Sequence, residues 1–288
     1  MRYLFLSLLF SLSLFAFKVD AQSFDVANGK STIVEFEAQK NIHYKKVIFG
    51  KKSFKIYKHP TKKGKFYALI PVSYYAKLGD KKLKIVYVDV DAQKQKTKTI
   101  YLHIKDGAYK KEQIKVSASK VNPKGKKVKK RISKEYAQAM KIYNHVTDKS
   151  YINSKFIKPL DSFITSEFGK ARVYNSTLKG YHSGTDFRAK TPTPIKASND
   201  GRVVLVKDRF YSGGTVIIDH GHGIYTCYFH MSKFDVKEGD MVKKGTIIGL
   251  SGSSGRVTGP HLHFATRVKG VQVDPLQLME LLNGELLR

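Results

Sequence analysis

Alternation of apolar and polar residues dominates the first half of this chain and restricts it to a β fold. Between residues 22 and 120, apolar side chains recur at every second position in short runs, and pairs such as Lys63-Gly64 and Asp106-Gly107 supply turns. Alternation places each apolar set on one face of a strand. The clearest runs are 34–38, 54–56, 66–70, 86–90, 100–104 and 114–116. They predict a small β-sandwich, which could be immunoglobulin-like.

The N-terminal segment is typical of an export signal. Arg2 precedes an apolar run from Tyr3 to Phe17, and Val19 and Ala21 stand where a signal peptidase reads the chain. This run is shorter than the ~20 residues that a membrane-spanning helix needs. We therefore expect a signal peptide over residues 1–21, a periplasmic or cell-envelope location and no transmembrane segment after cleavage. An uncleaved anchor is the alternative.

Positive charge is concentrated in the N-terminal half. The 288 residues include 53 Lys and Arg against 23 Asp and Glu, a formal net charge of +30. Residues 22–135 hold 30 basic and 9 acidic side chains, whereas residues 136–288 hold 21 and 13. Such a charge attracts polyanions. Because we expect export, we predict no nucleic-acid partner and favour anionic wall polymer, lipid headgroups or acidic peptides. A general lysine bias on solvated faces is the alternative.

A basic linker and a helix are expected between two domains. The run NPKGKKVKKR at 122–131 combines Pro, Gly and dense charge, which is typical of a linker. Apolar residues then recur at helical spacing and predict a helix over about 134–146. These residues are Ile132, Tyr136, Met140 and Tyr143. We expect an N-terminal β-domain over 22–120, the linker and helix over 121–152, and a C-terminal domain over 153–288.

Six of the ten histidines fall between residues 182 and 263, among short apolar runs and Gly-rich turns that predict an antiparallel β-domain. His261 and His263 are two apart on a predicted strand, so their imidazoles share a face. His182 and Asp186 offer an imidazole and a carboxylate across a Gly-containing turn. Two imidazoles and a carboxylate are a common zinc site. Taken alone, the HxH pair could also be two surface histidines.

The C-terminal half resembles the lysostaphin/LytM-type zinc metallopeptidases. The matching motifs are HSGTDF (182–187), GGTVIIDHGHGIYTCYFH (213–230) and TGPHLHF (258–264), and the resemblance covers about residues 163–275. It implies an antiparallel β peptidase domain with one Zn²⁺ per chain. The metal ligands it implies are His182, Asp186 and His263. The unligated catalytic residues it implies are His230 and His261, whose division of roles stays open, although we assign proton abstraction to His261.

The same resemblance implies hydrolysis of peptide bonds in peptidoglycan stems or crosslinks during cell-wall remodelling. We favour a D,D-endopeptidase that can also act as a D,D-carboxypeptidase, because the exported multidomain architecture resembles envelope peptidases of two-membrane bacteria. One alternative is a catalytically inactive LytM-like activator of another wall hydrolase, although such regulators typically lack metal ligands. A lipoyl/biotinyl-type carrier, suggested by GDMVKKGTIIG, and an anionic-polymer binding protein are the others.

Strand parity and cysteine content give further expectations. If residues 226–230 form a regular strand, Thr226 and Tyr228 share the face of His230, whereas Cys227 points into packing as a buried thiol. A single cysteine excludes an internal disulfide. His220 and His222 flank a glycine, so they are expected to support a loop rather than bind metal.

The N-terminal β-domain could also inhibit the enzyme. On a flexible linker it could cover the groove and offer a carboxylate to zinc. Glu35 and Glu37, expected to be exposed on a strand, are the candidates.

Overall fold

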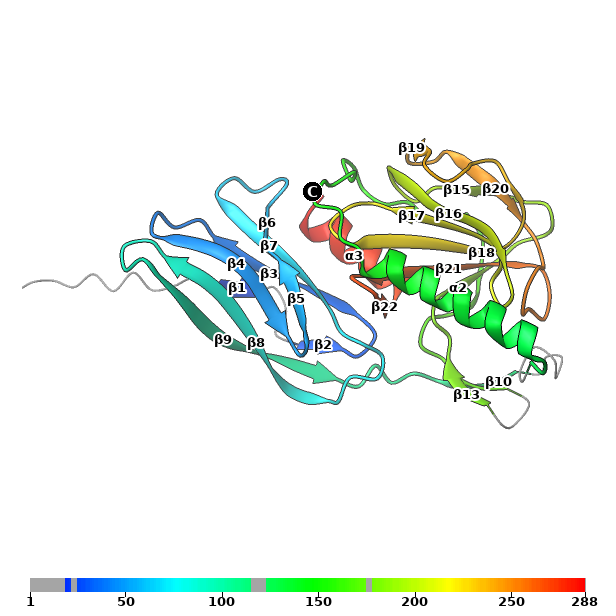
Figure 1. The fold of residues 1–288 in the computed structure, drawn as a ribbon, viewed down its shortest axis with the longest axis horizontal. Helices are drawn as coiled ribbons and strands as arrows, with labels where there is room; N and C mark the ends of the chain where they lie inside the picture. The colour runs from blue at the N-terminus through cyan, green and yellow to red at the C-terminus, as the bar shows by residue number, and fades with distance from the viewer. Residues whose placement is uncertain (1–18, 22–24, 115–122, 175–177, 288) are drawn as a thin grey trace, which may run out of the picture.

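The computed structural model describes residues 19–21, 25–114, 123–174 and 178–287, and it shows a mainly β protein, as predicted. A β-sandwich, blue to cyan in Figure 1, lies beside a larger C-terminal module, green to red. Residues 1–18 of the expected signal peptide lie outside the described part. None of the helices in the described part is both long and apolar enough to span a bilayer.

Two sheets form the N-terminal sandwich. One has the order β1 (Val19–Ala21), β3 (Ser31–Glu37), β7 (Lys65–Pro71) and β6 (Tyr57–Lys58). The other has the order β2 (Asp25–Ala27), β9 (Lys94–Lys105), β8 (Gly79–Asp89), β4 (Ile42–Phe49) and β5 (Lys52–Lys55). Alternate residues of both sheets, including Phe36, Val47, Ile70 and Ile85, are fully buried between them. The period-two pattern therefore predicted this sandwich correctly.

A large antiparallel sheet forms the C-terminal module. Its main order is β11 (Ile164–Ser166), β14 (Thr185–Arg188), β21 (His261–Val268), β18 (Ile224–Phe234), β17 (Gly213–Asp219), β16 (Gly201–Arg209) and β19 (Met241–Val242). The remaining strands of this sheet are β15 (Pro194–Lys196), β20 (Ile247–Ser251) and β22 (Val271–Val273). Its core includes Phe187, Tyr228, Leu262 and Phe264, each fully buried.

Helix α2 (Lys126–Asn144) crosses one face of this sheet (Figure 1). It begins within the basic run that we expected to be a linker, so that expectation is wrong for residues 126–131. Lys and Arg are good helix formers. The Arg131 guanidinium also binds Glu135 one turn later, at 2.7 Å. Farther along, Tyr143 packs against the sheet together with Ala139, and Met140 is partly buried there. Tyr136 is 65% exposed, so the predicted apolar stripe is correct only at its C-terminal end.

The chain that leaves the sandwich adds a strand to the C-terminal half. Strand β10 (Lys111–Ile114) pairs in parallel with β12 (Ala171–Tyr174), which pairs with β13 (Leu178–Tyr181). The last element, α3 (Pro275–Glu285), begins at Asp274, whose side chain accepts hydrogen bonds from Leu276 N and Gln277 N. The Gln277 side chain in turn exchanges two hydrogen bonds with the backbone of Ser31 in the sandwich.

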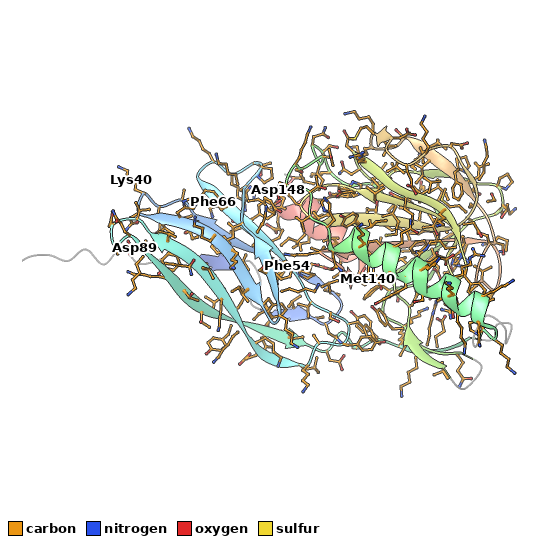
Figure 2. All side chains as sticks on the ribbon, viewed as in Figure 1. Lys40, Phe54, Phe66, Asp89, Met140 and Asp148 are labelled. Carbon is orange, nitrogen blue, oxygen red and sulfur yellow. The ribbon has the colours of Figure 1, made fainter. Side chains whose placement is uncertain are left out.

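The sandwich docks at one end of strands β18 and β21. His222, just before β18, stacks on Tyr57 with ring centroids 3.6 Å apart, and its Nδ1 lies 2.9 Å from the Tyr67 hydroxyl. Lys55 and Asp148 form an ion pair at the same junction, where Figure 2 labels Phe54 and Asp148. His222 therefore supports a loop, as expected, and also holds the two modules together.

Glu35 is not the exposed carboxylate that alternation suggested. It is 2% exposed, and its carboxylate is held by Lys62 at 2.5 Å and Lys65 at 3.4 Å. The expectation fails because both faces of β3 are covered: Phe36 faces the sandwich core, whereas Ile33, which shares the face of Glu35, belongs to the apolar cluster of the C-terminal module.

Candidate metal centre and catalytic cleft

Three distant residues of the sequence meet at the edge of the C-terminal sheet. Asp186 on β14 lies opposite His263 on β21, because these antiparallel strands pair in that register. The His182 Nε2 atom lies 2.9 Å from Asp186 Oδ1 and 3.0 Å from His263 Nδ1. His263 Nδ1 is 2.7 Å from the same Asp186 oxygen. The structure thus brings together the three residues that were predicted as metal ligands.

The chemistry of this cluster fits a divalent cation. Three potential ligand atoms lie within 4.8 Å of one another. The His182 Nδ1–H donates to the Glu167 carbonyl oxygen at 2.7 Å, which leaves Nε2 turned toward the cluster. Burial raises the pKa of Asp186, but its close contacts with the His182 and His263 imidazoles outweigh burial and hold the pKa below its usual range. Burial lowers the pKa of His263 to about 4, which favours the neutral imidazole that binds metals.

Two further histidines flank the cluster. His230 and His261 have ring centroids 4.9 Å apart, and His230 lies 6.0 Å from the ring of His263. The His230 Nδ1 is 2.8 Å from the Ser254 carbonyl oxygen, and the His261 Nδ1 is 2.8 Å from that of Gly259. Each imidazole therefore donates through Nδ1 to the backbone. The His261 Nε2 is directed to the cluster and lies 3.7 Å from Asp186 Oδ1.

His230 reaches this face through a β-bulge, which the parity prediction did not include. Phe229 lies opposite His263 and stacks on its ring at 5.4 Å, so a regular strand would turn the next side chain to the other face. Instead the β17–β18 register shifts here, and His230 has a φ of 63°. Thr226 and Tyr228 therefore do not share its face. Gly214 on the neighbouring strand β17 is the sequence feature that accompanies this bulge. A Cβ at position 214 would lie 2.3 Å from the Met231 carbonyl oxygen, so a larger residue would clash there.

Sequence reasoning missed an arginine that touches the cluster from outside. The Arg172 guanidinium on β12 lies 3.3 Å from Asp186 Oδ2 and 3.0 Å from Glu112 Oε2 on β10. It also donates to the Ser166 hydroxyl at 3.3 Å. These contacts hold the Asp186 carboxylate so that its other oxygen faces the histidines. No local motif connects residues 112, 172 and 186, so a single sequence could not reveal them.

Two other candidates have structural roles. Cys227 is 1% exposed, as predicted, with its Sγ 3.4 Å from the Tyr143 hydroxyl, and burial raises its pKa to about 11. His220 is fully buried between the Asp200 carbonyl oxygen and the Thr226 hydroxyl, both at 2.7 Å. Burial lowers its pKa to about 4. Both side chains therefore belong to the packing of the sheet.

A cleft of about 400 Å³ opens beside the cluster. It extends from Asp186 and His261 past Arg188 and Thr165 to the β10 strand. The lining of this cleft comes from β10 and the C-terminal module rather than from the sandwich strands. The sandwich contacts the C-terminal module at Ile224 and Val268, and its Tyr74 also stacks on Tyr181, the residue before His182, with ring centroids 3.9 Å apart.

Comparison with known proteins identifies relatives of this half. Residues 180–275 match the model of peptidase family M23. The chain is 43% identical over 122 residues to the peptidoglycan DD-endopeptidase ShyA of Vibrio cholerae, covering 41% of this chain and 28% of that protein. It is 41% identical over 97 residues to the DD-carboxypeptidase/endopeptidase Mpg of Neisseria meningitidis, covering 34% and 22%. The chain thus spans less than a third of these relatives.

One solved structure resembles almost the whole chain. The crystal structure of a putative peptidase M23 from Pseudomonas aeruginosa superposes with a TM-score of 0.65 and 26% identity. The match covers 88% of this chain and 94% of that one. The similarity therefore includes the N-terminal β-sandwich as well as the C-terminal sheet.

Proposed function

We propose, from the match of residues 180–275 to the model of peptidase family M23, that the chain is a zinc-dependent peptidase that cuts peptidoglycan. The favoured activity is that of a D,D-endopeptidase with additional D,D-carboxypeptidase activity, in agreement with the activities for which ShyA and Mpg are named. The observation that carries the proposal is the meeting of His182, Asp186 and His263 beside an open cleft.

In this proposal each side chain at the site has a defined task. His182, Asp186 and His263 would hold one zinc ion, and three protein ligands are typical of catalytic zinc sites. Bound zinc supplies a Lewis acid that polarises the scissile carbonyl and makes water more acidic. His261 takes the proton of the attacking water through Nε2. Burial lowers the pKa of His230 to about 3, so His230 would accept a proton and stabilise the oxyanion only as negative charge develops beside it. Arg172 keeps Asp186 oriented.

The proposal also places the protein in the cell envelope. Residues 1–21 would direct export, and 22–120 would form a β-domain that holds anionic wall polymer through its positive charge. Residues 121–152 would connect it to the peptidase domain at 153–288. Inhibition through the Glu35 carboxylate of the β-domain is not part of this proposal, because Glu35 is buried and paired with Lys62 and Lys65.

Digestion of purified sacculi tests the activity. The full chain should reduce crosslinked muropeptides, and His263→Ala should lose both this activity and bound zinc. His43→Ala, an exposed histidine of the sandwich, is the matched control and should retain both. An inactive activator of another hydrolase is the competing function, and it predicts no change in muropeptides by the purified chain alone. That result would overturn the enzyme assignment.

A further inference from the structure

Arg188 occupies a distinctive position beside the proposed catalytic centre. It is the last residue of β14, two positions after Asp186, so both side chains lie on one face of the strand. Its partner in the register is His261, one of the two flanking histidines. Arg188 is exposed and lines the cleft together with these two residues.

Two arginines, Arg172 and Arg188, line the cleft, and they differ in whether the described residues provide an ion-pair partner. Arg172 is committed to Asp186, to Glu112 and to the Ser166 hydroxyl. For the Arg188 guanidinium, no ion pair or side-chain hydrogen bond occurs among the residues that the structure describes; only its backbone N–H is bonded, to Phe163 O. The described residues therefore provide no polar partner for this guanidinium, although Arg188 lines the cleft.

The distance along β14 from Asp186 to Arg188 can be compared with the length of a substrate residue whose peptide bond lies at the ligand cluster. Two residues of an antiparallel strand advance by ~6.8 Å. One extended peptide residue spans ~3.3–3.6 Å. A group bound by Arg188 would therefore lie within one or two residues of a carbonyl held beside Asp186 and His263. An arginine at that distance can bind a carboxylate through two parallel hydrogen bonds.

We propose that Arg188 binds the free carboxylate of the residue that supplies the leaving amine, an inference that rests on the proposed function. In a D,D bond, the carbon next to the scissile nitrogen carries such a carboxylate. Two substrates provide it: a crosslink to a diamino diacid, and a terminal D-alanyl-D-alanine. In a glycyl–glycine bridge, the corresponding carboxyl group is consumed in the next peptide bond. Arg188 would thus direct the cleft toward D,D bonds.

Matched substrates test this assignment on the full-length zinc-loaded protein. The first pair is a stem pentapeptide ending in D-alanyl-D-alanine, with either a free carboxylate or a terminal amide. The second pair is a crosslinked dimer whose diamino diacid carboxylate is either free or amidated. The variants are Arg188→Gln and Arg188→Lys. The control is Arg202→Gln, an exposed arginine on β16 of the same sheet.

Wild type should prefer the free carboxylate, and Arg188→Gln should lower kcat/KM for that substrate by about 10- to 100-fold. The same variant should leave kcat/KM for the amide within about threefold, so the preference disappears. Arg188→Lys should restore part of it, and zinc content should equal that of wild type. An effect in one pair alone still supports the proposal and identifies the source of the carboxylate.

Two results would overturn the inference while the proposed function stands. The first is an equal loss on the acid and the amide in Arg188→Gln, and the second is a preference that persists without Arg188. If wild type cleaves neither pair but cuts glycyl–glycine peptides, both the D,D assignment and the role of Arg188 are wrong. If it cleaves no peptide at all, the proposed function fails as well.

Discussion

Removing the His222 imidazole should weaken the junction between the two modules by a measurable amount. The ring stacks on Tyr57 at 3.6 Å, and its Nδ1 lies 2.9 Å from the Tyr67 hydroxyl, on a residue only 5% exposed. His222→Ala would leave that hydroxyl without its partner inside the interface. The stack and the hydrogen bond are separate contributions, and each has a known range.

The expected cost follows from these two contacts. A buried hydroxyl that loses its partner costs ~1–3 kcal/mol. An aromatic stack contributes ~0.5–1.5 kcal/mol beyond its buried area. His222→Ala should therefore lower the free energy of unfolding by about 2–4 kcal/mol. Tyr67→Phe removes the hydroxyl itself, so adding it to His222→Ala should cost less than the sum of both changes, with a coupling of about 1–2 kcal/mol.

Urea unfolding of the full chain, followed by circular dichroism, measures this cycle. With m of ~3 kcal/mol/M, a loss of 3 kcal/mol moves the midpoint by about 1 M. His43→Ala, exposed on the outer sheet of the sandwich, should leave the midpoint unchanged. Strict additivity of the two substitutions would show that Tyr67 and His222 do not interact, and the docking contact would then be refuted.

Three further predictions concern buried groups. Burial lowers the pKa of His220 to about 4, so the unfolded state binds more protons than the folded state below pH ~6.5. The free energy of unfolding should therefore fall by about 3 kcal/mol between pH 7 and 4. Urea titrations should show a smaller fall for His220→Gln. Cys227, whose pKa burial raises to about 11, should react with a thiol reagent only after unfolding, and rapid labelling of native protein would contradict this. Glu135→Ala should cost about 2 kcal/mol, because its carboxylate accepts from Phe210 N at 2.9 Å, whereas exposed Lys134→Ala should change stability by less than about 0.5 kcal/mol in the same assay.

The parts of the fold that follow from a repeating pattern could be predicted from the sequence. Alternation gave the sandwich, and the two-residue spacing of His261 and His263 put both imidazoles on one face of β21. Helical spacing predicted the C-terminal half of α2, although it placed Tyr136, which is 65% exposed, on the packing face. In each case a single period decides which side chains are buried, and no knowledge of distant residues is needed.

The remaining features depend on contacts between distant segments. Glu35 was expected to be exposed because a sandwich has one solvated face on each sheet, yet the second module covers that face. The ion pair from Arg172 to Glu112 links strands β12 and β10, which pair only in three dimensions. The sequence of the first turns of α2 is typical of a linker. In the structure, Arg131 of this segment pairs with Asp208 on β16, which is distant in the sequence.

The bulge at His230 makes the cleft sensitive to chain length rather than to side-chain identity. Between the pairs Tyr228–Val216 and Met231–Gly214, β18 has one residue more than β17. One residue added to β17 between Gly214 and Val216 would restore a regular ladder, and His230 would then point to the face opposite Phe229 and His263. Such a protein would keep its three potential ligands while the His230 ring leaves their side of the sheet, so the relative lengths of β17 and β18 decide whether His230 lies beside the cluster.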